Sequence, residues 1–351
     1  MASKPFPILF ITSTRIGDAV LSSGLLKKLV DEIPHARFTV AAGPAAAPLF
    51  RDVPRLDQLI AMEKRGSGLH WLDLWSKVRR TRWGLVVDVR GSGLSAALSA
   101  KVRAVYKSPG EGAEPEHKVV EMARLLKVAD DPPSPHIFVS DETQADADRR
   151  LGDGGPILAL APGANWIGKR WPSERFSVLA TRILGRDGAM SNGRLLLVGG
   201  PEDRRAAEAV RRELPRKRVI DTTGEVDLLT VQAMLKRARL FIGNDSGLMH
   251  MSAAAGTPTL GLFGPSDERR YGPWGANARA LRGPRSFDAY RAIDPQLNQS
   301  LSHMADLSVE RVMGAAKRLL ADTEPKGDSG PEPEAAPEPQ PDETPAESQV
   351  G

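Results

Sequence analysis

Four short polar segments of the sequence carry the residue types that could do chemistry, and each follows an apolar run. They are STRIGDAV at 13–20, PGANWIGKRWP at 162–172, VGGPED at 198–203 and NDSGLMHMSAA at 244–254. An apolar run of this length that ends in polar residues is typical of a buried strand followed by a loop. Ligands of parallel α/β sheets bind beyond the carboxyl ends of the strands, so these loops form the candidate site.

The last segment has the chemistry of a phosphate site. Asp245, Ser246 and Gly247 follow the apolar run LFIG and lead into a predicted helix that contains His250. Backbone N–H groups at a helix start, with a serine hydroxyl beside them, bind phosphate well. The alternative is an aspartate that caps the helix and a histidine with a structural role, and these residues alone leave both open. A serine hydrolase is disfavoured, because Asn244 stands where the nucleophile turn requires glycine.

Two further segments offer charged groups. Lys169 and Arg170 place two cations in a loop that could neutralise a leaving diphosphate, or they could simply be a solvated pair. Asp18 follows the first strand and precedes an amphipathic helix. It could cap that helix, or act as a general base if a substrate hydroxyl approaches it.

Other signals are weak. The sequence has no GxGxxG after its first strand and no GxxxxGK[ST], so neither a dinucleotide fingerprint nor a P-loop is supported. Asp146 and Asp148 spell a DxD, but they fall in a polar helical stretch and are interpreted as surface residues. The six histidines show no metal-ligand spacing, and we expect neither a metal nor a cofactor.

A basic and aromatic cluster occupies residues 71–83. Its tryptophans and cations are compatible with a nucleic-acid site, but also with an amphipathic helix whose tryptophans pack, or with a contact to an anionic acceptor. We expect no nucleic-acid partner, and predict that Arg79, Arg80 and Arg82 bind the anionic acceptor.

Composition limits the protein class. Residues 322–351 are rich in Pro, Glu, Ala and Gly and carry a net charge of −8, so the rest of the chain, which totals +4, carries +12. That segment is predicted to be a disordered acidic tail. The absence of cysteine fits a reducing compartment, and no run approaches the ~18 apolar residues of a membrane span. We therefore expect a cytoplasmic protein with an anionic partner.

The elements that position the four loops alternate between strands and helices. This alternation predicts an α/β fold of two doubly wound parallel sheets that meet near residues 140–156 and face a cleft. The expected domains are 1–150 and 151–307. They are followed by a helix over 308–321, capped by Ser308, and by the tail at 322–351.

Taken together and in order, the loops resemble glycosyltransferase family 9, the bacterial lipopolysaccharide heptosyltransferases. The resemblance rests on GDAVLSSGLL at 17–26, LAPGANWIGKRWP at 160–172 and NDSGLMHMSAAAGTPTLGLFGPSD at 244–267. It covers roughly residues 6–320. Two positions depart from the family pattern: Ser23 replaces a usual proline, and Asn165 stands where Thr or Glu is frequent.

The resemblance implies a GT-B fold of two Rossmann-like domains with a C-terminal helix that crosses back to the first. It implies metal-independent, inverting transfer of heptose from ADP-heptose to the inner core of lipopolysaccharide, an anionic glycolipid at the inner face of the cytoplasmic membrane. Asp18 would be the base and Lys169 the cation beside the donor phosphates. The implied donor-binding residues are Gly163, Ala164, Asn165, Glu202, Asp203, Val226, Asp245, Ser246, Gly247 and His250. Another nucleotide-sugar donor, or a non-catalytic binding module, remains the alternative.

Overall fold

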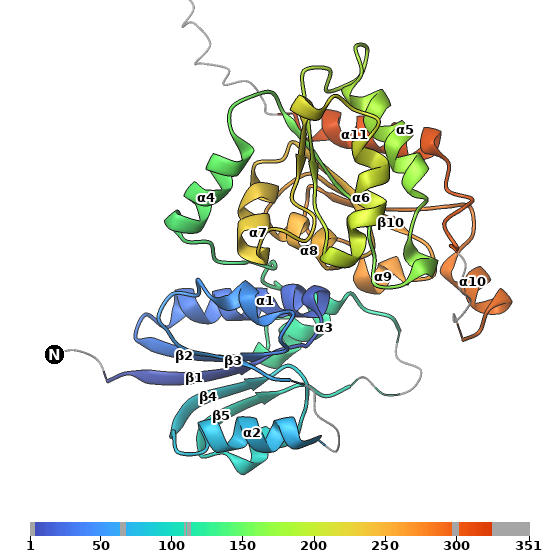
Figure 1. Ribbon diagram of the computed structural model, residues 1–351. Coiled ribbons are helices and arrows are strands. Elements are labelled where there is room, and N and C mark those ends of the chain that lie inside the picture. Colours follow the sequence, from blue (N-terminus) through green and yellow to red (C-terminus); the bar gives the residue numbers. More distant parts are fainter. Residues whose placement is uncertain (1–3, 64–67, 109, 111–113, 297–301, 325–351) are drawn as a thin grey trace, which may run out of the picture.

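Two parallel sheets, each covered by helices, lie one above the other in the computed structural model (Figure 1). It describes residues 4–63, 68–108, 110, 114–296 and 302–324. The expected pair of doubly wound α/β domains is confirmed. The predicted tail lies outside the described residues from position 325 onward. No helix in the described ranges is long and apolar enough to cross a membrane.

The first sheet has the order β3-β2-β1-β4-β5 and every pairing is parallel. Helices α1 and α3 cover the face toward the second half of the molecule, and α2 covers the opposite face (Figure 1). With β1 at the centre, the loop that leads to Asp18 in the first turn of α1 leaves the middle of the sheet. The strands are β1 (Phe6–Ile11), β2 (Ala36–Ala42), β3 (Leu56–Ala61), β4 (Trp83–Asp88) and β5 (Ala100–Val105), and the helices are α1 (Ile16–Glu32), α2 (Leu69–Val78) and α3 (Lys118–Ala123).

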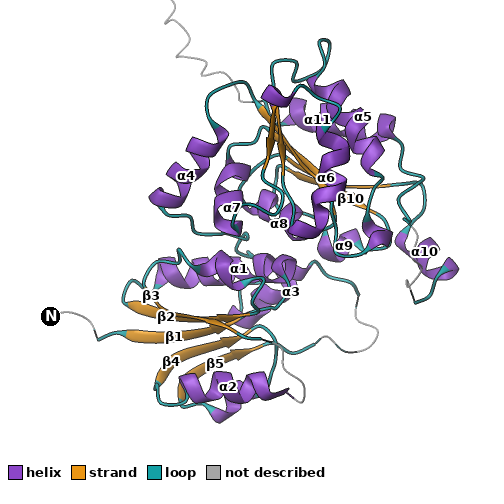
Figure 2. Ribbon diagram, in the orientation of Figure 1, coloured by secondary structure: helices purple, strands orange, loops and turns teal. Residues whose placement is uncertain are grey.

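The second sheet has the order β11-β10-β9-β6-β7-β8, again all parallel (Figure 2). Its strands are β6 (Ile157–Ala161), β7 (Arg194–Leu197), β8 (Val219–Asp221), β9 (Leu240–Asn244), β10 (Thr259–Phe263) and β11 (Ala278–Arg282). Its helices are α4 (Asp141–Leu151), α5 (Ser173–Leu184), α6 (Arg204–Arg211), α7 (Leu228–Lys236), α8 (Gly247–Ala254), α9 (Glu268–Tyr271), α10 (Phe287–Ile293) and α11 (Val309–Asp322).

One hydrophobic cluster runs through both halves. It joins the buried face of α1, with Ala19 and Val20, to Met249 and Met251 of α8 and to the buried residues of α7. Burial of apolar surface is the main favourable term in folding, so the two sheets are held together by a shared core.

The chain crosses between the two halves before α4. This helix packs against α7 in the second half, which differs from the boundary at residue 150 that we expected. The crossing segment is proline-rich and passes close to α1: a Cβ on Gly24 would lie 2.2 Å from the carbonyl oxygen of Pro133. The hydroxyl of Ser23, the residue that replaces the family's proline, accepts a hydrogen bond from the backbone N–H of His136 at 2.9 Å. Small residues at these two positions let the connection lie against the helix.

The C-terminal helix forms as expected, with the Ser308 hydroxyl accepting a hydrogen bond from the N–H of Arg311 at 3.2 Å. Its apolar stripe, which includes Val312 and Ala316, packs against α5 and the second sheet. This differs from the expected packing toward the first domain. An amphipathic stripe shows that a helix covers an apolar surface, but it does not show which surface.

Candidate active site

Helices α1 and α8, one from each half, begin against each other. A Cβ on Gly247 would lie 2.6 Å from Cγ2 of Ile16, and a Cβ on Gly17 would lie 3.0 Å from Cδ2 of His250. Contacts this short leave no room for a side chain at either helix start. The loop after β1 and the loop after β9 therefore meet at one place, which we call the domain junction.

Lys169 reaches the same junction from the loop after β6. Its Nζ lies 2.6 Å from Oδ2 of Asp245, and the Asp245 side chain is only 7% exposed. The N-cap residue of helix α8 is Ser246, which makes no side-chain cap, and Asp245 pairs with the lysine instead of capping the helix. Asn244, next to it, binds the carbonyl groups of Pro162 and Gly163 through Nδ2 and thereby ties the two loops together.

Asp18 lies in the first turn of α1, half-buried at the junction. The N-cap residue of the helix is Arg15, which makes no side-chain cap, so Asp18 does not have the capping role considered above. Burial raises the pKa of Asp18 above its ordinary value, against the opposing effect of the cations Lys118, Arg15, Lys169 and Arg270. A carboxylate with a raised pKa binds a proton more readily once it is ionised, which suits a general base.

His250 is buried and uncharged near neutral pH. Burial lowers its pKa to about 4, although Asp245 acts in the opposite direction. Its Nδ1 and the Oγ of Ser246 are both buried without a hydrogen-bond partner in the described part of the protein. Buried polar atoms are nearly always paired, so two unpaired ones at the start of α8 mark a place where a ligand would bind.

The other residues that the sequence predicts to bind the donor differ in their burial and in their distance from the start of α8. Gly163 and Ala164 are buried in the loop after β6, and Nε of Arg170 holds the carbonyl of Ala164 at 2.8 Å. Asp203 lies against Gly163, accepts a hydrogen bond from the N–H of Gly200 at 3.1 Å and has its pKa raised by burial. The side chains of Glu202 and Asn165 are exposed, and Val226 packs at the edge of the shared core.

The structure does not bring the predicted acceptor-binding arginines to the junction. Arg79, Arg80 and Arg82 are exposed between the end of α2 and the start of β4. In a parallel sheet the start of β4 lies at the edge opposite to the one that Asp18 follows. The tryptophans of this cluster pack: Trp83 is 4% exposed, and Trp71 and Trp75 lie against the core under α2.

Two cations that act on Asp18, Lys118 and Arg270, and the carboxylate that pairs with both, Glu121, were not singled out from the sequence. Lys118 and Glu121 belong to α3 of the first half, and Arg270 belongs to α9 of the second. They occur in the sequences HKVVE and DERRY, which match no known motif. Their one sequence signal was that α3 follows β5, since the segment after a strand of a parallel sheet lies on the side where ligands bind.

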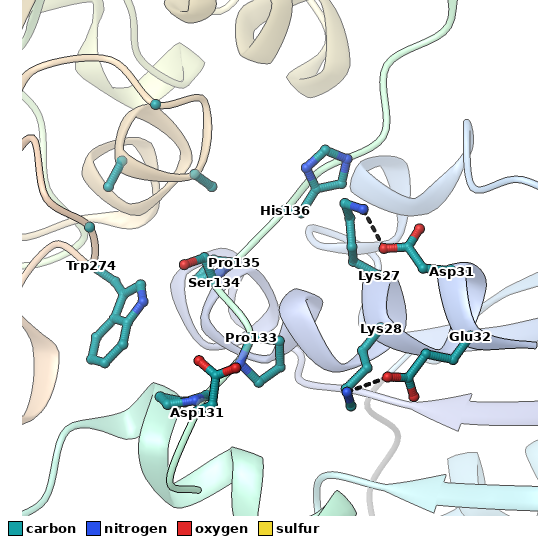
Figure 3. A pocket seen from close by; sticks show the side chains of 15 residues that line it. Lys27, Lys28, Asp31, Glu32, Asp131, Pro133, Ser134, Pro135, His136 and Trp274 are labelled. Atoms are coloured by element: carbon teal, nitrogen blue, oxygen red, sulfur yellow. Dashed lines mark hydrogen bonds and ion pairs between the residues drawn. The ribbon is translucent and has the colours of Figure 1, made fainter. Parts of the chain in front are cut away.

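A pocket of about 650 Å³ lies at the other ends of α1 and α8 (Figure 3). Trp274 and Pro133 face it, and Lys27 and Lys28 stand on its other side. Both lysines are paired with carboxylates of their own helix. The pocket is therefore separate from the residues at the helix starts.

Asp146 and Asp148, the DxD of the sequence, lie on α4, where arginines pair with them. The described residues contain no group of three His, Asp or Glu that could hold a metal ion.

Comparison with known proteins identifies the family of the chain. Residues 111–294 match the model of glycosyltransferase family 9 (heptosyltransferase). The chain is 23% identical to lipopolysaccharide heptosyltransferase 3 of Escherichia coli over 345 residues, covering 89% of this chain and 97% of that protein.

Solved structures show the same fold. A family 9 glycosyltransferase from Veillonella parvula superposes with a TM-score of 0.75 at 24% identity, covering 92% of this chain and 99% of that one. The E. coli ADP-heptose lipopolysaccharide heptosyltransferase II gives a TM-score of 0.70 at 21% identity, covering 90% and 99%. The family match spans more than half of the sequence and includes the loops that carry Lys169, Asp245 and His250. The chain therefore belongs to glycosyltransferase family 9.

Proposed function

We propose that the protein transfers a heptose from ADP-heptose to a hydroxyl of the inner core of lipopolysaccharide, with inversion at the anomeric carbon. One observation carries the proposal. Asp18 of the first half stands at the same junction as Lys169 of the second, close enough for the lysine to act on its pKa. A base and a cation from different domains, beside unpaired polar atoms at a helix start, suit a reaction between an acceptor and a phosphorylated donor.

In the proposed step one proton is transferred, one bond to the anomeric carbon forms and another breaks. Asp18 accepts the proton of the acceptor hydroxyl as that oxygen bonds to the anomeric carbon. The bond from that carbon to the diphosphate breaks, and ADP leaves with the electron pair. Because the oxygen attacks opposite the leaving group, the configuration inverts. A positioned base contributes roughly 10²–10⁴ in rate.

The second half supplies the donor side of this proposal. The start of α8 offers backbone N–H groups and the unpaired Oγ of Ser246 to the diphosphate. Lys169 would then share its charge between Asp245 and the leaving phosphate. His250 is uncharged at neutral pH, so it contributes a hydrogen bond and no charge. Asp203 and Glu202 are proposed near the ribose and Val226 near the adenine.

The curated relatives are named for heptose transfer, and one solved relative is named for ADP-heptose. These names suggest the donor and the acceptor class. The acceptor would be an anionic glycolipid at the inner face of the cytoplasmic membrane, which the +12 charge of residues 1–321 suits. An acceptor role for Arg79, Arg80 and Arg82 stays a prediction that would require contact far from the junction.

The test is transfer of heptose from ADP-heptose to a purified inner-core acceptor by the wild type and by Asp18→Asn. We expect the variant to fold normally and to lose roughly 10²–10⁴ in kcat. Asp31→Asn is the matched control, because Asp31 is an exposed carboxylate on the same helix that pairs with Lys27. Full activity in Asp18→Asn would remove Asp18 from its role. Absence of transfer by the wild type would overturn the proposed substrates.

A ligand screen tests the identity of the donor nucleotide independently of the reaction. ADP, GDP, UDP and CDP are added singly to the wild type, and thermal unfolding is followed. A ligand that binds only the folded protein raises the melting temperature. We expect the largest shift with ADP; an equal or larger shift with another nucleotide would contradict ADP-heptose as the donor while leaving the reaction class in place.

A further inference from the structure

Glu121 is a buried carboxylate that the proposed chemistry does not use. It is 4% exposed, and its Oε1 accepts a hydrogen bond from Nζ of Lys118 at 2.8 Å and another from the hydroxyl of Tyr106. Its Oε2 lies 2.6 Å from Nη2 of Arg270. An unpaired buried charge is costly, so these contacts explain how a glutamate can occupy this position.

The two cations come from different halves of the molecule. Lys118 begins α3 of the first half, and Arg270 belongs to α9 of the second. The contact is reinforced nearby, where Nε2 of His117 lies 2.9 Å from the carbonyl oxygen of Gly272. Glu121 is thus the single anion to which one cation of each half is bound.

Both cations also act on Asp18, and they leave hydrogen-bonding capacity unused. Lys118 and Arg270 each favour the ionised form of Asp18, and α3 packs beside the helix that carries it. Arg270 donates from Nε to the hydroxyl of Tyr271 and pairs through Nη2 with Glu121, which leaves Nη1 available among its described contacts. Two cations that share one carboxylate have a net charge of +1, whereas the Lys169 and Asp245 pair is neutral.

We propose that Glu121 is a positioning residue that holds Lys118 and Arg270 as a clamp for an anionic group of the acceptor beside Asp18. The inference rests on the proposed function, since it assigns a further part of that site. The clamp is complete only when the two domains are together, because Arg270 reaches Glu121 across the domain junction. The protein therefore binds the anionic group of the acceptor only while its two domains are in contact, which is also when Asp18 faces the second half.

The experiment compares two forms of one acceptor. The probe is a deacylated inner-core oligosaccharide, used in its anionic form and in a form with its phosphates removed and its carboxylates converted to methyl esters. Kinetic constants are measured for the wild type, Glu121→Gln and Arg270→Gln. Loss of a hydrogen bond to a charged group costs about tenfold or more in affinity. We expect the acceptor KM to rise by about that factor for the anionic form only, with the donor KM unchanged.

The matched control is Arg269→Gln. Arg269 is the exposed neighbour of Arg270, carries the same charge and pairs with Asp267 at the start of its own helix. This variant should leave the acceptor KM unchanged. Equal changes for the charged and the neutralised acceptor, or no change in either variant, would overturn the clamp and leave Glu121 with a structural role.

One further measurement keeps the outcomes distinguishable. Binding of the anionic oligosaccharide is measured by calorimetry with ADP present, so the clamp is tested even if the wild type transfers no heptose. Failure of the proposed function appears as absent transfer by the wild type; failure of the clamp alone appears as normal transfer with unaltered acceptor selectivity in the variants. If Glu121→Gln does not fold, Arg270→Gln answers the question, because the Arg270 side chain is 28% exposed.

Discussion

Lys169 is bound to Asp245 before any substrate arrives, with 2.6 Å between Nζ and Oδ2. The two residues follow neighbouring strands, β6 and β9, so the pairing of the sheet brings their loops together. A cation held in place in this way needs little reorganisation when negative charge develops on a leaving group, which is the property that makes fixed charges effective in catalysis.

Replacement of Lys169 by Met should lower kcat by roughly 10²–10³, because the leaving diphosphate loses its fixed cation. The stability should also fall, since Asp245 becomes a buried carboxylate without its partner, though by less than the ~3–5 kcal/mol of a fully buried pair. Steady-state kinetics and denaturant unfolding measure the two effects. Lys28→Met, on an exposed pair of α1, should change neither. Unaltered turnover in Lys169→Met would contradict the role of the lysine.

The pH dependence of the reaction should report Asp18. Burial raises the pKa of its carboxyl, so the acidic limb of the kcat/KM profile should lie above the pH at which an ordinary aspartate ionises. Activity rises with pH through this limb, because the base must be ionised to accept a proton. Arg15 favours the ionised form, so Arg15→Gln should move the limb to still higher pH. Arg37→Gln, on an exposed pair with Asp57, should leave the limb where it is.

The buried His250 should make the protein less stable in mild acid. Its pKa is lowered by burial to about 4, whereas the unfolded chain titrates near the ordinary value of ~6.5. Between these two values the unfolded state binds a proton that the folded state does not, so stability falls as pH falls from about 6.5 to about 4. His250→Gln should remove up to about 3 kcal/mol of this dependence.

Chemical denaturation at a series of pH values measures this effect as the difference between wild type and variant. The exposed His35, changed to Gln, serves as the control. A variant with the same slope as the wild type across this range would show that the pKa of His250 is not lowered in the folded protein.

A methyl group at Gly247 should push the two domains apart. The new Cβ would lie 2.6 Å from Cγ2 of Ile16, which is too close for any real contact. We expect Gly247→Ala to cost ~1–3 kcal/mol in stability and to reduce turnover, because the helix starts move. Ile16→Ala in the same chain should restore part of both. Gly314→Ala is the opposite control: nothing lies within 3.4 Å of its Cβ on α11, so it should stabilise by up to ~1 kcal/mol.

The sequence predicted the central strands and the edge strand β8, at 218–221, but missed the edge strands β3, β5 and β11. Strands such as β1, β6 and β9 are buried on both faces and form continuous apolar runs. The edge strands β3, β5 and β11 are partly exposed and read LDQLIA, AKVRAV and ARALR, in which polar or charged residues interrupt the apolar run. Their pairing comes from the neighbouring strand and not from their own composition.

The candidate site was predictable only where a residue lies between the end of a strand and the first turn of the helix that follows it. Asp18, Lys169 and Asp245 satisfy this condition, and the structure brings all three to the junction. Glu121 and Arg270 reach it from helices, through a contact between the domains. Single-sequence patterns describe which face of an element is buried but not which domain surface will cover it, and that limit also explains the unexpected position of α11.

The apolar cluster that joins α1 to α7 and α8 restricts how the enzyme can move. A wide separation of the sheets would transfer buried methionine and leucine side chains into water, and this becomes more unfavourable with every square ångström uncovered. Any domain movement during turnover that keeps this hydrocarbon dry must therefore be small, and the close approach of the helix starts at Gly17 and Gly247 limits it further.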